Sequence, residues 1–126
     1  MQITLLYAGL LSIVLFVLSY RVVQIRRQGV TLGDGGDPTL QRRIRAHGNF
    51  TEYVPIILIM IALLEANQVP AYLLHVLGLA LLIARCLHGY AMSFTESFFF
   101  GRFWGTAITF LLLVVCGALC IYQAVL

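Results

Sequence analysis

The sequence has no lysine and very little charge of either sign. Charged residues make up 10% of the 126 positions and hydrophobic residues 61%, with a mean hydropathy of +0.96. Soluble domains average about 25% charged and about 45–50% apolar residues. This composition excludes an ordinary soluble domain and indicates an integral membrane protein. The net charge of +3 is also too small to indicate a nucleic acid partner.

Motifs for several common kinds of enzyme chemistry are missing as well. Neither a His-Glu-x-x-His nor a Gly-x-Ser-x-Gly motif occurs, so we expect no metal site and no serine hydrolase. The glycine-rich residues 28–38 lack a Walker pattern and a preceding strand, and we interpret them as a flexible connection. The three cysteines have no metal or redox spacing, and we interpret them as small buried hydrophobic residues: Cys86, Cys116 and Cys120.

What the sequence does contain is a series of long apolar segments. A helix needs roughly 20 residues to cross the hydrocarbon core of a bilayer, and we predict four spans, at about residues 3–24, 39–64, 71–92 and 102–122. We interpret the first as a retained span, because positive charge follows it rather than precedes it. The predicted fold is an all-α integral membrane bundle of four transmembrane helices in a single domain, residues 1–126.

The basic residues are unevenly distributed. All eight are arginine, and six of them lie between positions 21 and 45. Arginine collects on the cytoplasmic side of membrane proteins, which is a sufficient explanation for Arg21, Arg26 and Arg27. Since Arg102 follows the second connection on the same side, both termini are expected on the side away from the cytoplasm.

The beginning of the second span is unusually polar for a membrane helix. At about 100° per residue, its polar side chains fall within an arc of roughly 100°: Arg42, Arg45, Asn49, Glu52 and Tyr53. A charge at the centre of a span costs about 2.5–3.5 kcal/mol on insertion scales. Arg45 and Glu52 are therefore expected to face protein, a ligand or a water-filled cavity rather than lipid.

Arg85 on the third span and Arg102 at the start of the fourth lie at a similar depth to Arg42 and Arg45. Several guanidiniums with a carboxylate and an amide suit a small, multiply ionised ligand, and glutathione has the matching groups. An anionic lipid headgroup would also satisfy the arginines. In a third interpretation, Arg45 and Glu52 neutralise each other as a polar contact between helices. If the ligand carries a thiol, Arg102 is a candidate to favour the nucleophilic thiolate.

One segment of this chain resembles the second-helix signature of the MAPEG family, the membrane-associated proteins in eicosanoid and glutathione metabolism. Its sequence is Arg45-Ala46-His47-Gly48-Asn49-Phe50-Thr51-Glu52-Tyr53-Val54-Pro55. The four-span layout and the chain length agree, so the resemblance covers essentially the whole chain. It implies a homotrimer of four-helix bundles, with glutathione as co-substrate between adjacent subunits in the cytoplasmic leaflet. The compact chain is similar to bacterial members, which implies an inner-membrane location with both termini periplasmic.

The same resemblance assigns roles to individual residues. It implies that Arg102 is catalytic and stabilises the glutathione thiolate, and that a hydrophobic small molecule or lipid enters from the membrane. On the third helix, the family's glutathione-binding tyrosine corresponds to Met92, so Tyr90 or His88 is the candidate to replace it. The residues assigned to glutathione are Arg45, Asn49, Glu52 and Tyr53, with Arg42 and Arg26 at the edge, and Arg85, His88 and Tyr90 on the third helix.

Three function classes follow from these patterns. The first is a glutathione-dependent membrane transferase or peroxidase that acts on a lipophilic electrophile. The second is a non-catalytic trimeric membrane protein whose arginine-rich pocket binds an anionic lipid or another small anion. A small multidrug transporter is less well supported, because such four-span proteins are expected to carry an essential carboxylate in the first span, and none is present here.

Overall fold

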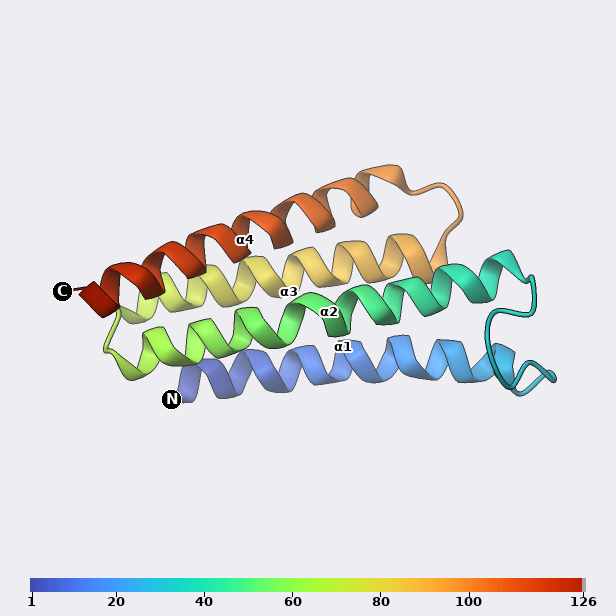
Figure 1. Cartoon of the computed structure of the whole chain (residues 1–126), viewed down its shortest axis with the longest axis horizontal. Helices are drawn as coiled ribbons and strands as arrows, with labels where there is room; N and C mark the ends of the chain where they lie inside the picture. The colour runs from blue at the N-terminus through green and yellow to red at the C-terminus, as the bar shows by residue number, and fades with distance from the viewer. Residues whose placement is uncertain (126) are drawn as a thin grey trace.

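The computed structural model describes residues 1–125, which form four long helices joined by short loops. In chain order these are α1 (Gln2–Arg26), α2 (Pro38–Ala66), α3 (Ala71–Phe94) and α4 (Phe99–Val125). They lie side by side, with both termini and the α2–α3 turn at one end and the α1–α2 and α3–α4 loops at the other, here called the loop end (Figure 1). Each helix is long and apolar enough to cross a membrane. The predicted all-α bundle of four spans is confirmed, whereas the trimer stays a prediction.

The helices extend up to three residues beyond their predicted ends. α2 begins as expected: Pro38 occupies its first turn, and Asp37 Oδ1 accepts hydrogen bonds from the backbone N–H groups of Thr39 and Leu40 at 2.8 and 3.3 Å. α4 begins earlier than predicted, at Phe99, because the aromatic run before Arg102 is already helical. Arg102 is therefore the fourth residue of α4 and not its first, as the predicted span had it.

α2 and α3 form the centre of the bundle. α1 packs against both, α4 packs against both from the other flank, and α1 and α4 do not touch. Inside lipid, helix association depends on close packing and polar contacts rather than on exclusion of water. The most extensive contact is between α3 and α4, where a Cβ added at Gly105 would lie 2.7 Å from His88 Cβ and 2.8 Å from the Ala84 carbonyl oxygen. Gly105 therefore allows α4 to approach α3 next to His88.

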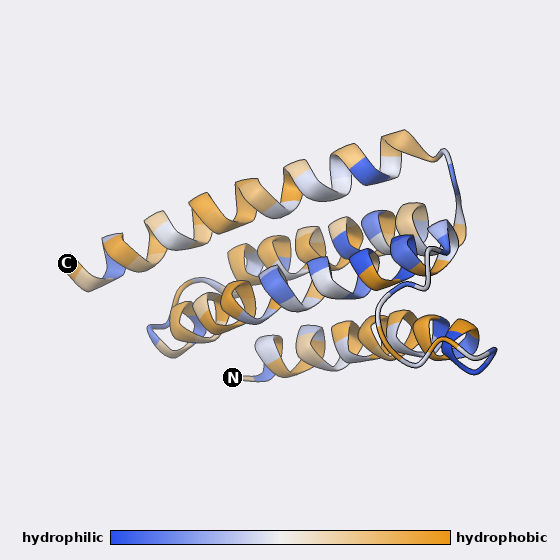
Figure 2. Cartoon of the chain, turned by 45° about the vertical axis from the view of Figure 1, so that its right-hand side comes forward, coloured by the Kyte–Doolittle hydropathy of each residue, from blue (hydrophilic) through white to orange (hydrophobic). Residues whose placement is uncertain are grey.

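Polar residues are concentrated toward the loop end. Figure 2 shows this bias, and the antiparallel order of the helices places all eight arginines in that half. At the opposite end, the carboxylate of Glu65 accepts hydrogen bonds from the backbone N–H groups of Ile3 and Thr4 at 2.9 and 2.8 Å. Glu65 thus caps the first turn of α1 from the end of α2, a contact that the sequence pattern did not predict.

The interpretation of the cysteines was wrong for one of the three. Cys116 is buried and Cys120 is half-buried, but Cys86 is exposed on the outer side of α3. Periodicity explains the difference, because Cys86 follows the inward-facing Arg85 by one residue, or about 100° around the helix. An apolar span has an outer face of its own, so an apolar neighbourhood in the sequence does not imply burial.

Candidate functional site

A pocket of about 190 Å³ opens between α2, α3 and α4 toward the loop end. We call it the arginine pocket, and its lining residues are Arg45, Asn49, His88, Met92, Arg102 and Thr106. Three of the four spans contribute, because one helical turn of each faces the same space. The structure therefore brings together Arg45, Asn49, His88 and Arg102, which the sequence assigned to one site.

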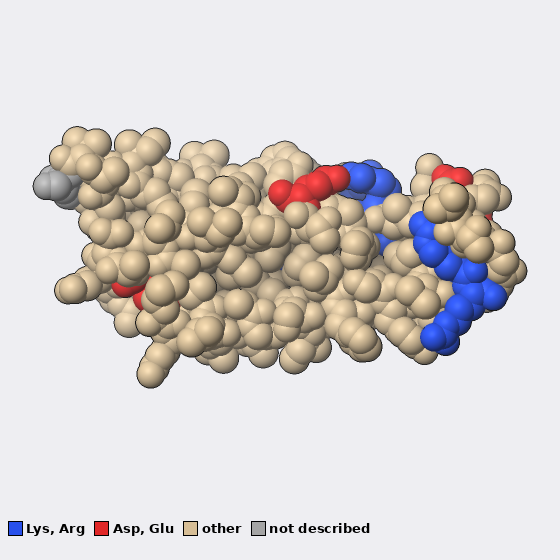
Figure 3. Space-filling view, turned by 60° about the horizontal axis from the view of Figure 1, so that its bottom comes forward, with Lys and Arg blue, Asp and Glu red and all other residues tan. Residues whose placement is uncertain are grey.

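Arg45 of this pocket forms an ion pair with Glu52, which lies outside the lining. Arg45 Nη1 lies 3.4 Å from Glu52 Oε1, and the two side chains are 54% and 49% exposed. Figure 3 shows acidic and basic atoms adjoining about midway along one face, apart from a larger group of basic and acidic atoms at the right-hand end. A half-exposed ion pair on a helix suited to the membrane requires a cover of protein, ligand or water.

Arg85 lies behind the pocket rather than in its lining. Its side chain is completely buried, and it donates hydrogen bonds from Nη2 to Asn49 Oδ1 at 2.8 Å and from Nη1 to Thr109 Oγ1 at 3.2 Å. Arg85 Nη2 also lies 3.1 Å from His88 Nδ1. The two residues are three positions apart, which places them on one face of α3. The guanidinium supports two pocket residues from the interior of the bundle.

The family's sequence model provides the decisive comparison. The MAPEG family model matches residues 4–122. The chain belongs to the MAPEG family. Inner membrane protein YecN of Escherichia coli strain K12 is 41% identical over 86 residues, which are 68% of this chain and 66% of that protein. The YecN of E. coli O6:H1 strain CFT073 matches with the same values. No solved structure matches the chain.

The two tyrosines expected at the site of this MAPEG chain lie in different places. Tyr53 is half-buried beside the site, with its ring edge-on to Phe110 of α4 at a centroid distance of 5.4 Å. Tyr90 is 55% exposed, stacks on Phe94, and lines an apolar groove between α1 and α3. The arginine pocket of one chain therefore includes His88 from α3 but not Tyr90.

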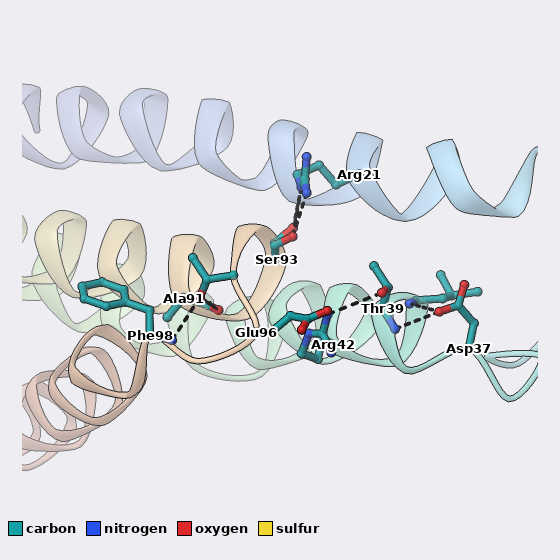
Figure 4. A network of polar contacts seen from close by, with 10 residues as sticks. Arg21, Asp37, Thr39, Arg42, Ala91, Ser93, Glu96 and Phe98 are labelled. Atoms are coloured by element: carbon teal, nitrogen blue, oxygen red, sulfur yellow. Dashed lines mark hydrogen bonds and ion pairs between the residues drawn. The ribbon is translucent and has the colours of Figure 1, made fainter.

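Arg42 lies at the edge of the site, at the loop end. Its Nη2 atom pairs with Glu96 Oε1 at 3.4 Å and contacts Thr39 Oγ1 at the same distance, as Figure 4 shows. Arg42 and Glu96 line a second pocket of about 140 Å³, which shares Arg102 and Met92 with the arginine pocket. The sequence pattern did not identify Glu96, because a single carboxylate in a loop has no helical face to reveal its partner.

Arg26 lies on the other side of α2. It donates a hydrogen bond to the Gly33 carbonyl at 3.0 Å and lines a groove of about 330 Å³ between α1 and α2. The same groove includes His47 and Ile44, whose side chains leave α2 on a different face from Arg45. Within one chain, the structure therefore does not bring Arg26 to the arginine pocket.

The donor set of the site is also informative about metals. Among residues 1–125, no three His, Cys, Asp or Glu side chains come close enough to hold a metal ion. The arginine pocket is lined by two guanidiniums and no carboxylate. Such a lining repels cations and attracts anions.

Proposed function

We propose that this MAPEG protein is a glutathione-dependent membrane transferase or peroxidase that acts on a lipophilic electrophile. The observation that carries the proposal is the arginine pocket, in which Arg45 and Arg102 face the same space as Asn49 and His88. Guanidiniums bind carboxylates, and amide and imidazole groups hydrogen-bond to peptide groups. Glu52 beside the pocket suits the ammonium group of glutathione.

Arg102 is the proposed catalytic residue. It is exposed to the pocket and forms no ion pair with any carboxylate in residues 1–125. A guanidinium beside the glutathione thiol favours the thiolate, which is the nucleophile. In conjugation, the sulfur bonds to the electrophilic carbon as a leaving group departs with its electron pair, or as a proton adds. In peroxidase chemistry, the thiolate attacks the terminal oxygen of a hydroperoxide and displaces an alkoxide, which takes up a proton and leaves as the alcohol. The sulfenic acid so formed reacts with a second glutathione to give the disulfide and water.

We further propose that the active form is a homotrimer. The arginine pocket of one chain is smaller than the roughly 300–1,000 Å³ of typical ligand pockets. The Arg45–Glu52 pair is half-exposed, and Arg26 with His47 lines a separate groove on the other side of α2. A ring of identical chains joins two different faces at every interface. In such a ring, the α1–α2 groove of one chain covers the arginine pocket of the next.

The distribution of charge supports a location in the inner membrane with both termini periplasmic. All eight arginines lie in the half of the bundle that carries the α1–α2 and α3–α4 loops, and arginine-rich ends of membrane helices stay cytoplasmic. The matched E. coli relatives are named inner membrane proteins. In this orientation the arginine pocket opens toward the cytoplasm, and the electrophile enters from the bilayer.

Glutathione titration of the purified full-length protein in lipid nanodiscs tests the proposal. Calorimetry is expected to show saturable binding to the wild type and at least about tenfold weaker binding to Arg45→Ala, which loses a charge-assisted hydrogen bond. Arg27→Ala is the matched control, because Arg27 is an exposed arginine outside the pocket. Absence of binding to the wild type, or equal losses in the two variants, would overturn the proposal.

A non-catalytic anion-binding protein is the second candidate. The Arg45–Glu52 pair favours it, because Glu52 already neutralises one of the two pocket arginines without any ligand. This candidate predicts that phosphatidylglycerol, but not glutathione, raises the melting temperature relative to phosphatidylcholine nanodiscs. A rise on adding glutathione in phosphatidylcholine supports the enzyme instead.

A further inference from the structure

Two neutral residues of the arginine pocket have their hydrogen bonding fixed from behind by Arg85. A guanidinium carries N–H donors and no acceptor. Each atom that bonds Arg85 must therefore present a lone pair to it. For Asn49 that atom is the carbonyl oxygen Oδ1, at 2.8 Å, and for His88 it is the ring nitrogen Nδ1, at 3.1 Å.

The opposite sides of the two side chains then face the ligand with N–H groups. With Oδ1 turned to Arg85, Asn49 presents its amide Nδ2 to the pocket. With Nδ1 as the acceptor, the neutral His88 ring carries its proton on Nε2. Neither Asn49 Nδ2 nor His88 Nε2 hydrogen-bonds to any residue within 1–125, and both side chains line the arginine pocket.

Arg85 itself is held rigidly enough to set these orientations. Its Nη1 donates to Thr109 Oγ1, and the Thr109 hydroxyl donates its own proton to the Gly105 carbonyl oxygen at 2.7 Å. The ring of Phe50 lies 5.8 Å from the Arg85 guanidinium carbon. The three partners of Arg85 are neutral, so no carboxylate competes for its donors.

The charges around the His88 ring also favour its neutral form. Arg85 contacts His88 directly, and Arg45 and Arg102 line the pocket that His88 faces. A positively charged imidazole would point an Nδ1–H at the N–H of Arg85 and would add a further cation to this cluster. Both effects favour a neutral ring with its proton on Nε2.

We propose that Arg85 is a positioning residue that fixes Asn49 and His88 so that both donate hydrogen bonds into the arginine pocket. With Arg45 and Arg102, the wall is then rich in donors and selects ligand groups that accept hydrogen bonds: carboxylates, peptide carbonyls and a thiolate. An ammonium group is excluded from this wall and is left to Glu52. The identity of the ligand rests on the proposed function, whereas the proton position on His88 is a property of the chain alone.

Nitrogen NMR of histidine-labelled protein in nanodiscs without ligand tests the positioning directly. His88 is assigned by the signals that disappear in His88→Gln. The wild type is expected to show a neutral ring with the proton on Nε2. Arg85→Met, which has a similar length but no donor, is expected to show a mixture of the two neutral tautomers. A wild-type His88 that carries its proton on Nδ1 or is positively charged overturns the inference, and so does an unchanged tautomer in Arg85→Met.

Glutathione affinity provides the second test. His88→Gln keeps an acceptor for Arg85 and a donor for the pocket, so it is expected to bind within about threefold of the wild type. His88→Leu keeps neither and is expected to bind about tenfold more weakly. Equal affinity of the Leu variant and the wild type contradicts the donor role. Melting temperatures of both variants identify any loss caused by misfolding.

The two proposals fail in distinguishable ways. If the wild type has the predicted tautomer but binds no glutathione, the proposed function fails and the role of Arg85 stands. If the wild type binds glutathione with its proton on Nδ1, the role of Arg85 fails and the proposed function stands.

Discussion

Two arginines in the polar half of the bundle are held in opposite ways. Arg85 is completely buried and shares its donors among three neutral partners from its own chain. Arg45 is 54% exposed, and its one ion-pair partner among residues 1–125, Glu52, is nearly as exposed. Both terminal nitrogens of Arg85 find partners within the fold, and only its buried Nε has none among residues 1–125, whereas Arg45 is open to a ligand or a neighbouring chain. Polar residues in an apolar helix thus fall into two kinds. Some, such as Arg85, hold other site residues in place, and others, such as Arg45, remain free to contact a ligand.

The largest effect on stability is expected at the close contact between α3 and α4 that helps to enclose Arg85. Gly105→Val adds a branched side chain where even a Cβ would lie 2.7 Å from His88 Cβ and 2.8 Å from two backbone atoms of α3. The variant is expected to lose about 3 kcal/mol or more of unfolding free energy, measured by denaturant titration in micelles.

Gly117→Val is the matched control for this prediction. Gly117 lies in the same helix, and an added Cβ there meets no atom within 4 Å. Its expected change is within about 0.5 kcal/mol. Equal destabilisation of the two variants would contradict the claim that the α3–α4 contact encloses Arg85.

The next largest effect is expected at Arg102, which, like Arg45, is open to a ligand. Arg102→Ala is expected to reduce the thiolate absorbance of bound glutathione about tenfold at neutral pH, because the nearby positive charge is lost. Its melting temperature should change little, since Arg102 is exposed and unpaired within residues 1–125. Arg102→Lys is expected to restore most of the thiolate signal. A full signal in Arg102→Ala would remove the catalytic role.

The sequence predicted the difference between the buried and the exposed polar residues only as far as helical periodicity determines which residues share a face. Periodicity grouped Arg45, Asn49 and Glu52 on one face of α2, and a spacing of three residues makes Arg85 and His88 neighbours on α3. The same geometry separates Tyr90 from His88, because two residues correspond to about 200° around a helix. The resemblance nevertheless assigned Tyr90 to glutathione, and the structure places it in the α1–α3 groove.

Periodicity could not show which side of each polar face turns inward. Arg85 was expected to bind the ligand, and its burial behind Asn49 depends on where α2 and α4 dock against α3. The contacts of Glu65 with α1 and of Glu96 with Arg42 were missed for the same reason. Each joins residues more than 50 positions apart, and no local pattern records such a pair.

A smaller effect is expected for the partner of Arg45. Glu52→Gln keeps the size of the side chain but removes its charge, and it is expected to weaken glutathione binding about fivefold through loss of the ammonium contact. N-acetylated glutathione lacks that ammonium, so its affinity should be the same for the wild type and the variant. If the variant weakens both ligands equally, Glu52 acts by orienting Arg45 instead.

The smallest effect is expected at the loop end. The Arg42–Glu96 pair spans 3.4 Å, and the Glu96 side chain is 81% exposed. Exposed ion pairs contribute about 0–1 kcal/mol, so Glu96→Gln should change stability by less than about 0.5 kcal/mol and glutathione affinity by less than about twofold. Asp34→Asn in the other loop is the control. A larger and specific loss of affinity in Glu96→Gln would mean that Arg42 must be held by this pair to bind the ligand. Arg42 would then resemble Arg85, which depends on partners within the chain, rather than Arg45, which is open to a ligand.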